Sequence, residues 1–280
     1  MTRNPARPYP FFSNFALLAA IAISMPWYAS ARPLPTSSTR TSKKATTHRH
    51  RYRGLPTYIS DPGAGDDSQF DDPVVRQAAL DALGRQNGSV VAVDPSNGRI
   101  LAIVGQKLAY STGFEPCSTL KPVIAVAALE KGVITPDTMI RIGRRRYMDM
   151  TEALAHSNNQ FFEELGRRLG FDTVWHFDHV FGLGERAGYD ISGEQPGLLP
   201  SAPPTYGGVA RMCSFGEGIR ITPLQLAAIV STIANGGTMY YLQYPQSTDA
   251  ARDFAPRVRR TLGIAPLLPE LRQGMLAAVL

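Results

Sequence analysis

The sequence contains only two cysteines, Cys117 and Cys213, among its 280 residues. Two cysteines cannot form the framework of a small disulfide-rich domain, so that class of fold is excluded. The spacing of the two cysteines leaves two alternatives open. They could form a single disulfide in an oxidising compartment, or both could be buried free thiols, and we expect two buried thiols. The chain also has no repeat of fixed period, which excludes solenoid architectures.

Acidic residues are missing from the first 53 positions, which carry nine Lys or Arg, whereas the remainder has 20 basic and 23 acidic residues. The formal charge of +6 therefore belongs to the N-terminal part, and the rest of the chain is close to neutral. A Pro-, Ser-, Thr- and Arg-rich stretch without interleaved aromatic residues is more typical of a solvated linker than of a nucleic-acid-binding surface. We predict a disordered basic linker over residues 32–70 and no nucleic-acid partner.

Long apolar runs are scarce, and the uncharged segment Phe11–Ser30 is the one that matters for targeting. Basic residues precede it and Ala29-Ser30-Ala31 follows its apolar centre, which is the order of a secretory signal. We predict a signal peptide or membrane anchor over residues 1–31. The run is short for a membrane span, which favours cleavage, whereas seven Lys or Arg between Arg32 and Arg53 oppose translocation. An exported protein is expected.

Hydrophobic patterning beyond residue 70 predicts a mixed α/β (α+β) domain. Two strongly apolar segments on either side of Pro95-Ser96-Asn97-Gly98 predict a β-hairpin that belongs inside a sheet covered by helices. The other expected elements are a helix over 73–83 capped by Asp71 or Asp72, a buried helix over 118–131, a mostly helical subdomain over about 135–190, a helix over 223–235, a strand within 237–244 and a final amphipathic helix from 269.

The segment Pro116–Pro122 places a serine and a lysine three residues apart where a loop enters the buried helix. At that spacing the Lys121 side chain stands on the same helical face as Ser118 and can reach its hydroxyl. Backbone N–H groups at a helix N-terminus stabilise negative charge on an attacked carbonyl. A lysine can act as a base near neutral pH only if it is desolvated. The alternative is a helix cap at Ser118 with a surface lysine.

Ser157-Asn158-Asn159 interrupts a good helical pattern in the predicted helical subdomain. Short polar side chains compete for backbone hydrogen bonds, so we expect a helix break that exposes Ser157 and Asn159. A hydroxyl can relay a proton and an amide can hold a peptide carbonyl. The alternative is a local helix cap.

Taken together, these motifs resemble the transpeptidase domain of penicillin-binding proteins, whose signature is S-x-x-K, S-D-N and K-T-G. The likeness extends over nearly all of residues 72–280 and includes VVAVDPSNGRILAIVG, PCSTLKP, ALAHSNNQFF and FGEGIRITPLQLAAIVSTIANGG. It implies a β-lactamase/transpeptidase-like fold, with Ser118 as acylated nucleophile, Lys121 as general base, Ser157 as proton relay and Asn159 as a substrate-amide contact. It implies no metal and no cofactor.

Two features depart from the family pattern. Cys117 stands where the family usually has glycine, which predicts a loop less suited to positive φ. The 280 residues contain no Lys-Thr-Gly or Lys-Ser-Gly triplet, which in the family lies on an edge strand after the terminal helix. We therefore expect residues 71–280 to form a partial transpeptidase domain whose sheet is incomplete at the C-terminus, and a chain that is inactive or unstable as it stands.

The resemblance predicts a serine-type D-Ala-D-Ala transpeptidase that cross-links peptidoglycan stem peptides and is acylated by β-lactam antibiotics. A D,D-carboxypeptidase, a serine β-lactamase and a non-catalytic penicillin-binding sensor or scaffold remain alternatives. No glycosyltransferase domain occurs in the sequence, so strand polymerisation requires a partner that has one. Membrane anchoring through residues 1–31 is a further expectation. The resemblance also implies a location in the periplasm or at the outer face of a bacterial cytoplasmic membrane.

Overall fold

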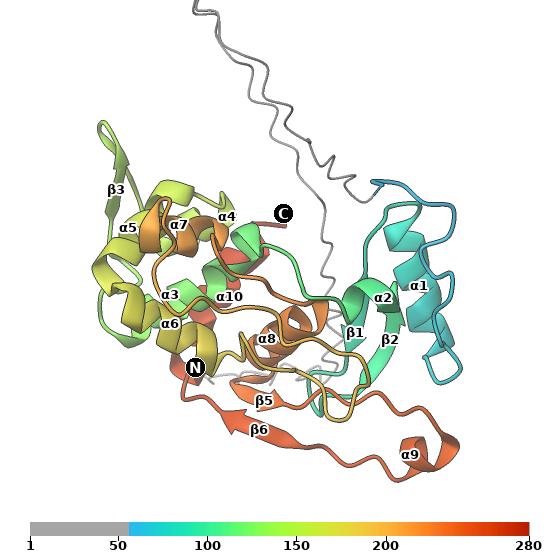
Figure 1. Ribbon diagram of the computed structural model, residues 1–280. Helices are drawn as coiled ribbons and strands as arrows, with labels where there is room; N and C mark the ends of the chain where they lie inside the picture. Colours follow the sequence, from blue (N-terminus) through green and yellow to red (C-terminus); the bar gives the residue numbers. More distant parts are fainter. Residues whose placement is uncertain (1–55, 280) are drawn as a thin grey trace, which may run out of the picture.

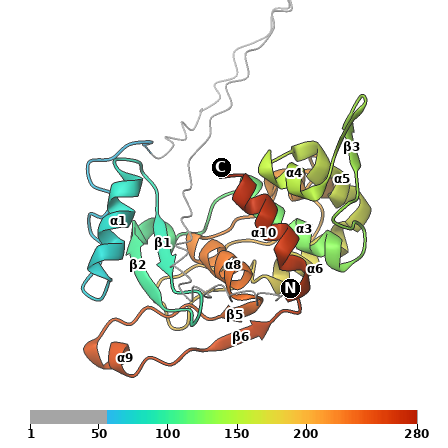
Figure 2. The same ribbon diagram turned by 180° about the vertical axis from the view of Figure 1, so that it is seen from behind.

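The computed structural model describes residues 56–279. Their elements form two groups, and helix α8 lies where the two groups meet (Figures 1 and 2). The first group is α1 (Pro73–Leu83), β1 (Val90–Val93), β2 (Ile100–Val104) and α2 (Gln106–Ala109), with α8 (Pro223–Asn235), β5 (Thr238–Tyr240), α9 (Thr248–Arg252) and β6 (Val258–Thr261) beside it. The second is η1 (Cys117–Leu120), α3 (Lys121–Glu130), β3 (Ile140–Gly143), β4 (Arg146–Met148), α4 (Met150–Ala155), α5 (Asn159–Leu169), α6 (Phe171–Val180), α7 (Gly208–Phe215), η2 (Ala265–Leu267) and α10 (Leu268–Ala277).

The predicted mixed α/β class, with antiparallel strands and a helical subdomain, is confirmed. The strands of the described residues pair as three antiparallel hairpins, β1–β2, β3–β4 and β5–β6, rather than as one continuous sheet. A parallel bridge between Arg99 and Gln243 connects the first hairpin to the chain beyond β5. Gly98 at the β1–β2 turn has φ 79°, and a Cβ there would lie 2.6 Å from the Cβ of Tyr240. This close approach of the two hairpins therefore requires glycine.

Helix α1 begins where the sequence predicts. The carboxylate of Asp72 accepts hydrogen bonds from the N–H groups of Val74 and Val75 at 2.9 and 3.0 Å, and Pro73 occupies the first helical turn. Proline loses nothing there because the first N–H groups of a helix have no helical partner.

The predicted linker ends earlier than residue 70. Asp66 accepts hydrogen bonds from the N–H groups of Gly105 and Gln106, both at 2.9 Å, and pairs with Arg76 at 3.1 Å. Tyr58 forms a β-bridge with Gln86. Residues 58–70 thus pack on the domain through carboxylate and backbone contacts, which hydrophobic periodicity does not reveal. Residues 32–55 and the predicted signal peptide or anchor lie outside the described residues.

Helix α3 is the centre of the helical group, and α4, α5, α6, α7 and α10 all contact it. Its predicted burial is confirmed, since seven of its ten residues are buried. Because most of these residues are Ala or Val, neighbouring helices approach closely. The buried residues are Lys121, Val123, Ile124, Ala125, Val126, Ala127 and Ala128.

The two cysteines are both free, and only Cys213 is buried. The prediction of two buried thiols is therefore wrong for Cys117, which is exposed at the start of η1. None of the helices between residues 56 and 279 has the length and apolar character needed to cross a bilayer.

Candidate active site

Ser118 lies in the second position of η1, which continues directly into α3. The loop before it is attached to the chain before α8, because Phe114 and Ile221 exchange two backbone hydrogen bonds at 2.9 and 2.8 Å. Gly113 makes this pairing possible, since a Cβ at its position would lie 2.7 Å from the carbonyl oxygen of Ile221. Thr119 closes the turn by donating its hydroxyl to the carbonyl oxygen of Pro116 at 2.6 Å. These contacts fix where the Ser118 hydroxyl lies.

Lys121 is buried, with 2% of its surface exposed, although its ammonium group is charged in water. Its Nζ lies 3.1 Å from the Ser118 Oγ, so the two side chains meet as their spacing predicts. The alternative of a surface lysine is therefore wrong, and Ser118 makes no side-chain cap for η1 or α3.

The helix break predicted at Ser157 is confirmed, and it supplies three further oxygen atoms around the same ammonium group. Helix α4 ends at Ala155 and α5 begins at Asn159. Lys121 Nζ donates to the backbone carbonyl oxygen of Ser157 at 2.6 Å, to its Oγ at 2.9 Å and to the Asn159 Oδ1 at 2.7 Å. The four residues named from the sequence thus converge on one nitrogen atom.

Asn158, between those two residues, is the cap of helix α5. Its Oδ1 accepts a hydrogen bond from the N–H of Phe161 at 2.9 Å. The cap that we considered as an alternative is therefore present, but it belongs to the middle residue of the motif. Ser157 and Asn159, on either side of it, remain directed at Lys121.

Both motif segments contain a non-glycine residue in the left-handed backbone region, Cys117 at φ 51° and Ser157 at φ 49°. The loop before Ser118 thus does adopt positive φ with cysteine in the place of glycine, contrary to our expectation. This conformation costs about 1–2 kcal/mol for a residue with a Cβ. Such residues concentrate at functional sites, where the surrounding structure holds them.

Burial lowers the pKa of Lys121 from its ordinary value of 10.5 to about 8, and the nearby Cys117 opposes this shift weakly. The ring centroid of Phe162 lies 5.4 Å from Nζ, so one side of the ammonium group faces an aromatic side chain. With a pKa of about 8, roughly a tenth of the lysine is neutral at pH 7. The shift corresponds to a stability loss of about 3 kcal/mol at neutral pH, because the unfolded chain binds this proton more tightly.

An ammonium group has three N–H donors, whereas four oxygen atoms surround Lys121. A neutral amine has two N–H donors and one lone pair. The cluster can therefore accept the proton of the Ser118 hydroxyl while Nζ remains bound to the other oxygen atoms. Ser118 is half-buried and Ser157 is exposed, so neither residue is enclosed in the core.

Sequence reasoning missed two contributors to this site. The first is the carbonyl oxygen of Ser157, whose direction depends on the left-handed backbone. The second is the ring of Phe162. A Phe-Phe pair follows the Ser-Asn-Asn segment in the sequence, but its pattern only indicates a buried helix face.

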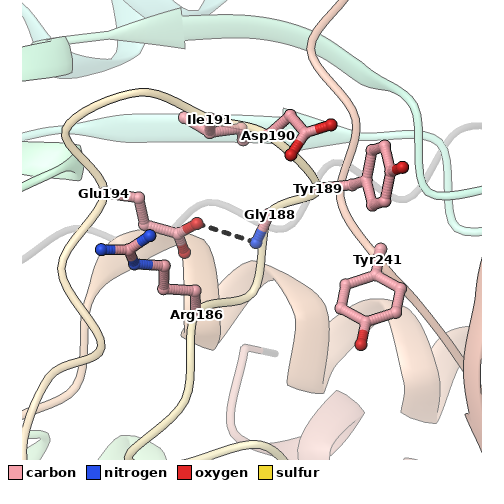
Figure 3. A pocket seen from close by; sticks show the side chains of 7 residues that line it. All are labelled: Arg186, Gly188, Tyr189, Asp190, Ile191, Glu194 and Tyr241. Atoms are coloured by element: carbon pink, nitrogen blue, oxygen red, sulfur yellow. Dashed lines mark hydrogen bonds between the residues drawn. The ribbon is translucent and has the colours of Figure 1, made fainter.

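A separate small pocket of about 280 Å³ lies at the loop after α6 and contains none of these residues (Figure 3). Glu194, 1% exposed, accepts hydrogen bonds from the N–H groups of Ala187 and Gly188 at 2.7 and 2.9 Å. Burial raises the pKa of this carboxyl group. Figure 3 shows the Glu194 side chain directed at the loop backbone, so its contacts hold the loop together. The lining residues are Arg186, Gly188, Tyr189, Asp190, Ile191, Glu194 and Tyr241.

Among curated proteins, the chain is similar to penicillin-binding protein PbpB of Mycolicibacterium smegmatis, with 28% identity over 239 residues that cover 73% of this chain and 37% of that protein. It is 30% identical over 185 residues to stage V sporulation protein D of Bacillus subtilis, covering 54% of this chain and 29% of the relative. The peptidoglycan D,D-transpeptidase FtsI of Escherichia coli is 26% identical over 183 residues, covering 54% and 31%. The chain thus spans about a third of the length of these bacterial relatives.

Among solved structures, Pseudomonas aeruginosa PBP2 in complex with WCK 5153 has a TM-score of 0.59 and 23% identity, and covers 72% of this chain and 58% of that chain. This likeness shows the fold. A peptidoglycan synthase complex that coordinates polymerization and crosslinking has a TM-score of 0.56 and 26% identity, and covers 69% and 42%. A family model matches residues 88–267, and it is described as the penicillin binding protein transpeptidase domain. The match covers more than half of the chain and includes Ser118, Lys121, Ser157 and Asn159. The chain therefore belongs to the penicillin-binding protein transpeptidase domain family.

Proposed function

We propose that this protein is a D,D-transpeptidase that cross-links peptidoglycan stem peptides through an acyl-enzyme on Ser118. The observation that carries the proposal is the position of Lys121, whose buried Nζ lies 3.1 Å from the Ser118 Oγ. A buried lysine with a lowered pKa beside a serine hydroxyl is a base beside a nucleophile. Relatives named as peptidoglycan D,D-transpeptidases support the same reaction.

In the acylation step, neutral Lys121 accepts the proton of the Ser118 hydroxyl while the Oγ attacks the carbonyl carbon of the D-Ala-D-Ala bond. Backbone N–H groups at the start of η1 face the developing negative charge, because the first N–H groups of a helical segment lack helical partners. The carbon–nitrogen bond then breaks and the last D-Ala leaves as an amine.

Ser157 is suited to carry the proton to that leaving amine. Lys121 Nζ contacts both hydroxyls, at 3.1 Å for Ser118 and 2.9 Å for Ser157, so one nitrogen can take a proton from the first and pass it to the second. In the second step an amine of a neighbouring stem peptide attacks the ester. Its proton returns through the same groups, a new amide bond forms, and Ser118 is released.

Asn159 is suited to hold the substrate. Its Oδ1 accepts from Lys121 at 2.7 Å, which leaves the two N–H donors of its amide for a substrate carbonyl. The resemblance assigns the substrate carboxylate and a second oxyanion donor to a Lys-Thr-Gly triplet, which these 280 residues do not contain. Loss of one oxyanion donor lowers the rate by roughly 10² to 10³, so slow acylation by this chain is expected.

Labelling with a fluorescent penicillin tests the proposal. We expect slow but stable labelling of the wild type and none of Ser118→Ala, while Ser60→Ala, at an exposed serine in the segment before α1, serves as the matched control and keeps the label. Fast release of label identifies a β-lactamase. Absence of label on a folded wild type contradicts acylation by this chain and favours the non-catalytic scaffold. With a stem peptide and an acceptor amine, release of D-Ala without a cross-linked product identifies a carboxypeptidase.

The proposal places the protein outside the cytoplasm, with residues 1–31 as a signal peptide or anchor and residues 32–55 as a linker. Cell-wall relatives and the signal-like order of the first 31 residues support this location. β-Lactams are the expected inhibitors, since the matching family is described as the penicillin binding protein transpeptidase domain. The solved peptidoglycan synthase complex supports a glycosyltransferase partner.

A further inference from the structure

The hairpin formed by β3 and β4 stands out from the helical group in both views (Figures 1 and 2). Its inner face is attached to the main core by Ile140, Ile142 and Met148, all of which are buried. Its outer face pairs Arg141 with Tyr147 across the strands. Because its inner face is buried, the hairpin presents its outer residues on one side of the molecule.

Four arginines occupy six consecutive positions of this hairpin, and we call Arg141, Arg144, Arg145 and Arg146 the arginine cluster. All four are exposed. Between residues 138 and 148 the sequence has no acidic residue. Within residues 56–279, no carboxylate lies at ion-pair distance from any of the four, whereas Arg167 and Arg168 on α5 both pair with Glu164. The cluster therefore carries four positive charges that the described part of the domain does not neutralise.

Arg145 has φ 58° at the turn of the hairpin. Glycine or asparagine ordinarily occupies a left-handed position in a tight turn, because neither suffers the full clash of a Cβ. A long cationic side chain at this position is therefore unfavourable for the backbone. Its presence indicates that the side chain itself has a role outside the fold.

We propose that the arginine cluster docks the domain on an anionic lipid surface, with the guanidinium groups contacting lipid phosphates. The inference rests on the proposed function, which places the domain outside the cytoplasm, where the outer face of the membrane is within its reach. The guanidinium fork matches phosphate oxygen atoms in pairs. The projecting tip of the β3–β4 hairpin can lie against a flat bilayer surface, because this contact requires no binding pocket.

Apolar neighbours of the cluster favour lipid over other anionic partners. Met139, directly before β3, and Tyr147, on β4, are 55% and 53% exposed. Aromatic and apolar side chains beside basic residues are typical of the headgroup boundary of a bilayer. A two-stranded ribbon also fits the major groove of DNA, but it would not need this apolar flank.

The test is co-sedimentation of the full-length protein with vesicles of phosphatidylglycerol in phosphatidylcholine, and with vesicles of phosphatidylcholine alone. The variant is Arg144→Gln/Arg145→Gln/Arg146→Gln. The matched control is Arg167→Gln/Arg168→Gln/Arg252→Gln, which removes the same net charge from exposed positions elsewhere. The basic residues before position 54 are present in every protein, so they add equally to each measurement.

We expect binding to the anionic vesicles to weaken by roughly 10²-fold in the hairpin variant, since each basic residue near an anionic surface contributes roughly a factor of five. In the control variant, binding should weaken by less than about 5-fold. Equal weakening in both variants, or no binding by the wild type, overturns it. So does a selective loss of binding to double-stranded DNA or polyglutamate with vesicle binding unchanged.

Two further measurements separate the hairpin from the fold and from the proposed reaction. The unfolding midpoint checks that the variant is folded, and Arg141→Gln/Arg144→Gln repeats the test with the turn residue Arg145 unchanged. Penicillin labelling should stay at the wild-type level in all variants. Vesicle binding without labelling would contradict the proposed reaction alone, and labelling without vesicle binding would contradict the docking alone.

Discussion

The Nζ atom of Lys121 lies 2.6 Å from the backbone carbonyl oxygen of Ser157, a residue 36 positions further along the chain. A carbonyl oxygen accepts a hydrogen bond but has no proton to exchange. This contact therefore holds the amine in place, while the hydroxyls of Ser118 and Ser157 remain the groups that can exchange protons with it. It exists because Ser157 has the left-handed backbone that turns both its carbonyl and its hydroxyl toward α3.

The rate of acylation by a penicillin should rise with pH and level off above about pH 8. Lys121 acts as a base only when it is neutral, and burial sets its pKa at about 8. We expect roughly a tenfold increase per pH unit below pH 7, measured as the labelling rate with excess penicillin. A rate independent of pH between 6 and 9 would exclude Lys121 as the base.

Lys121→Arg should abolish labelling although the positive charge is kept. A guanidinium group remains protonated at any pH that the protein tolerates, so it cannot accept the Ser118 proton. We expect a decrease of at least 10²-fold in the labelling rate. Lys107→Arg, at an exposed position on α2, is the control and should label as the wild type does. Normal labelling of Lys121→Arg would mean that the lysine serves only as a positive charge.

Ser157→Ala and Asn158→Ala should separate chemistry from helix capping. The first removes a hydroxyl 2.9 Å from Nζ, and we expect at least a tenfold slower acylation with little change in stability. The second removes the cap of α5 and should lower the free energy of unfolding by about 1 kcal/mol. Labelling rates and urea unfolding of both variants check this, and Asn158→Ser should recover most of the lost stability. Equal effects of the two alanine variants on the labelling rate would assign Ser157 a structural role.

Cys117→Gly should stabilise the protein. Cys117 is exposed with φ 51°, so glycine removes the backbone clash without creating a cavity. We expect a gain of about 1 kcal/mol in the free energy of unfolding, measured by urea denaturation, with labelling retained. A loss of stability would show that the thiol makes a contact worth more than the backbone strain.

Asp178→Asn should flatten the dependence of stability on pH. Asp178 on α6 is completely buried near Cys213, and neither of its carboxylate oxygens has a hydrogen-bond partner among the described residues. Burial raises its pKa well above 3.8, so the folded state keeps a proton that the unfolded state loses. Wild-type stability should therefore fall, relative to Asp178→Asn, by up to about 1.4 kcal/mol per pH unit as the pH rises above 4. Parallel stability curves for the two proteins would show that the carboxyl group finds a partner.

Much of the fold follows from local pattern. The cap at Asp72, the hairpin around Gly98 and the buried face of α3 all depend on residues within a few positions of each other, and all three were predicted. The packing of residues 58–70 was not predicted, because Asp66 finds its partners about 40 positions away at Gly105 and Gln106. Carboxylate contacts of this kind leave no periodic signal in the sequence.

The sequence by itself determined that a serine and a lysine share one helical face, because residues three apart lie on the same side of an α-helix and also of a 3₁₀-helix such as η1. It also determined the helix break at Ser157, since short polar side chains compete with helical hydrogen bonds. Only the tertiary structure decided that these two segments meet. Burial of the Lys121 side chain, the lowering of its pKa and the approach of four oxygen atoms to one nitrogen all arise from the packing of α4 and α5 against α3, and that packing is set by contacts distant in the chain.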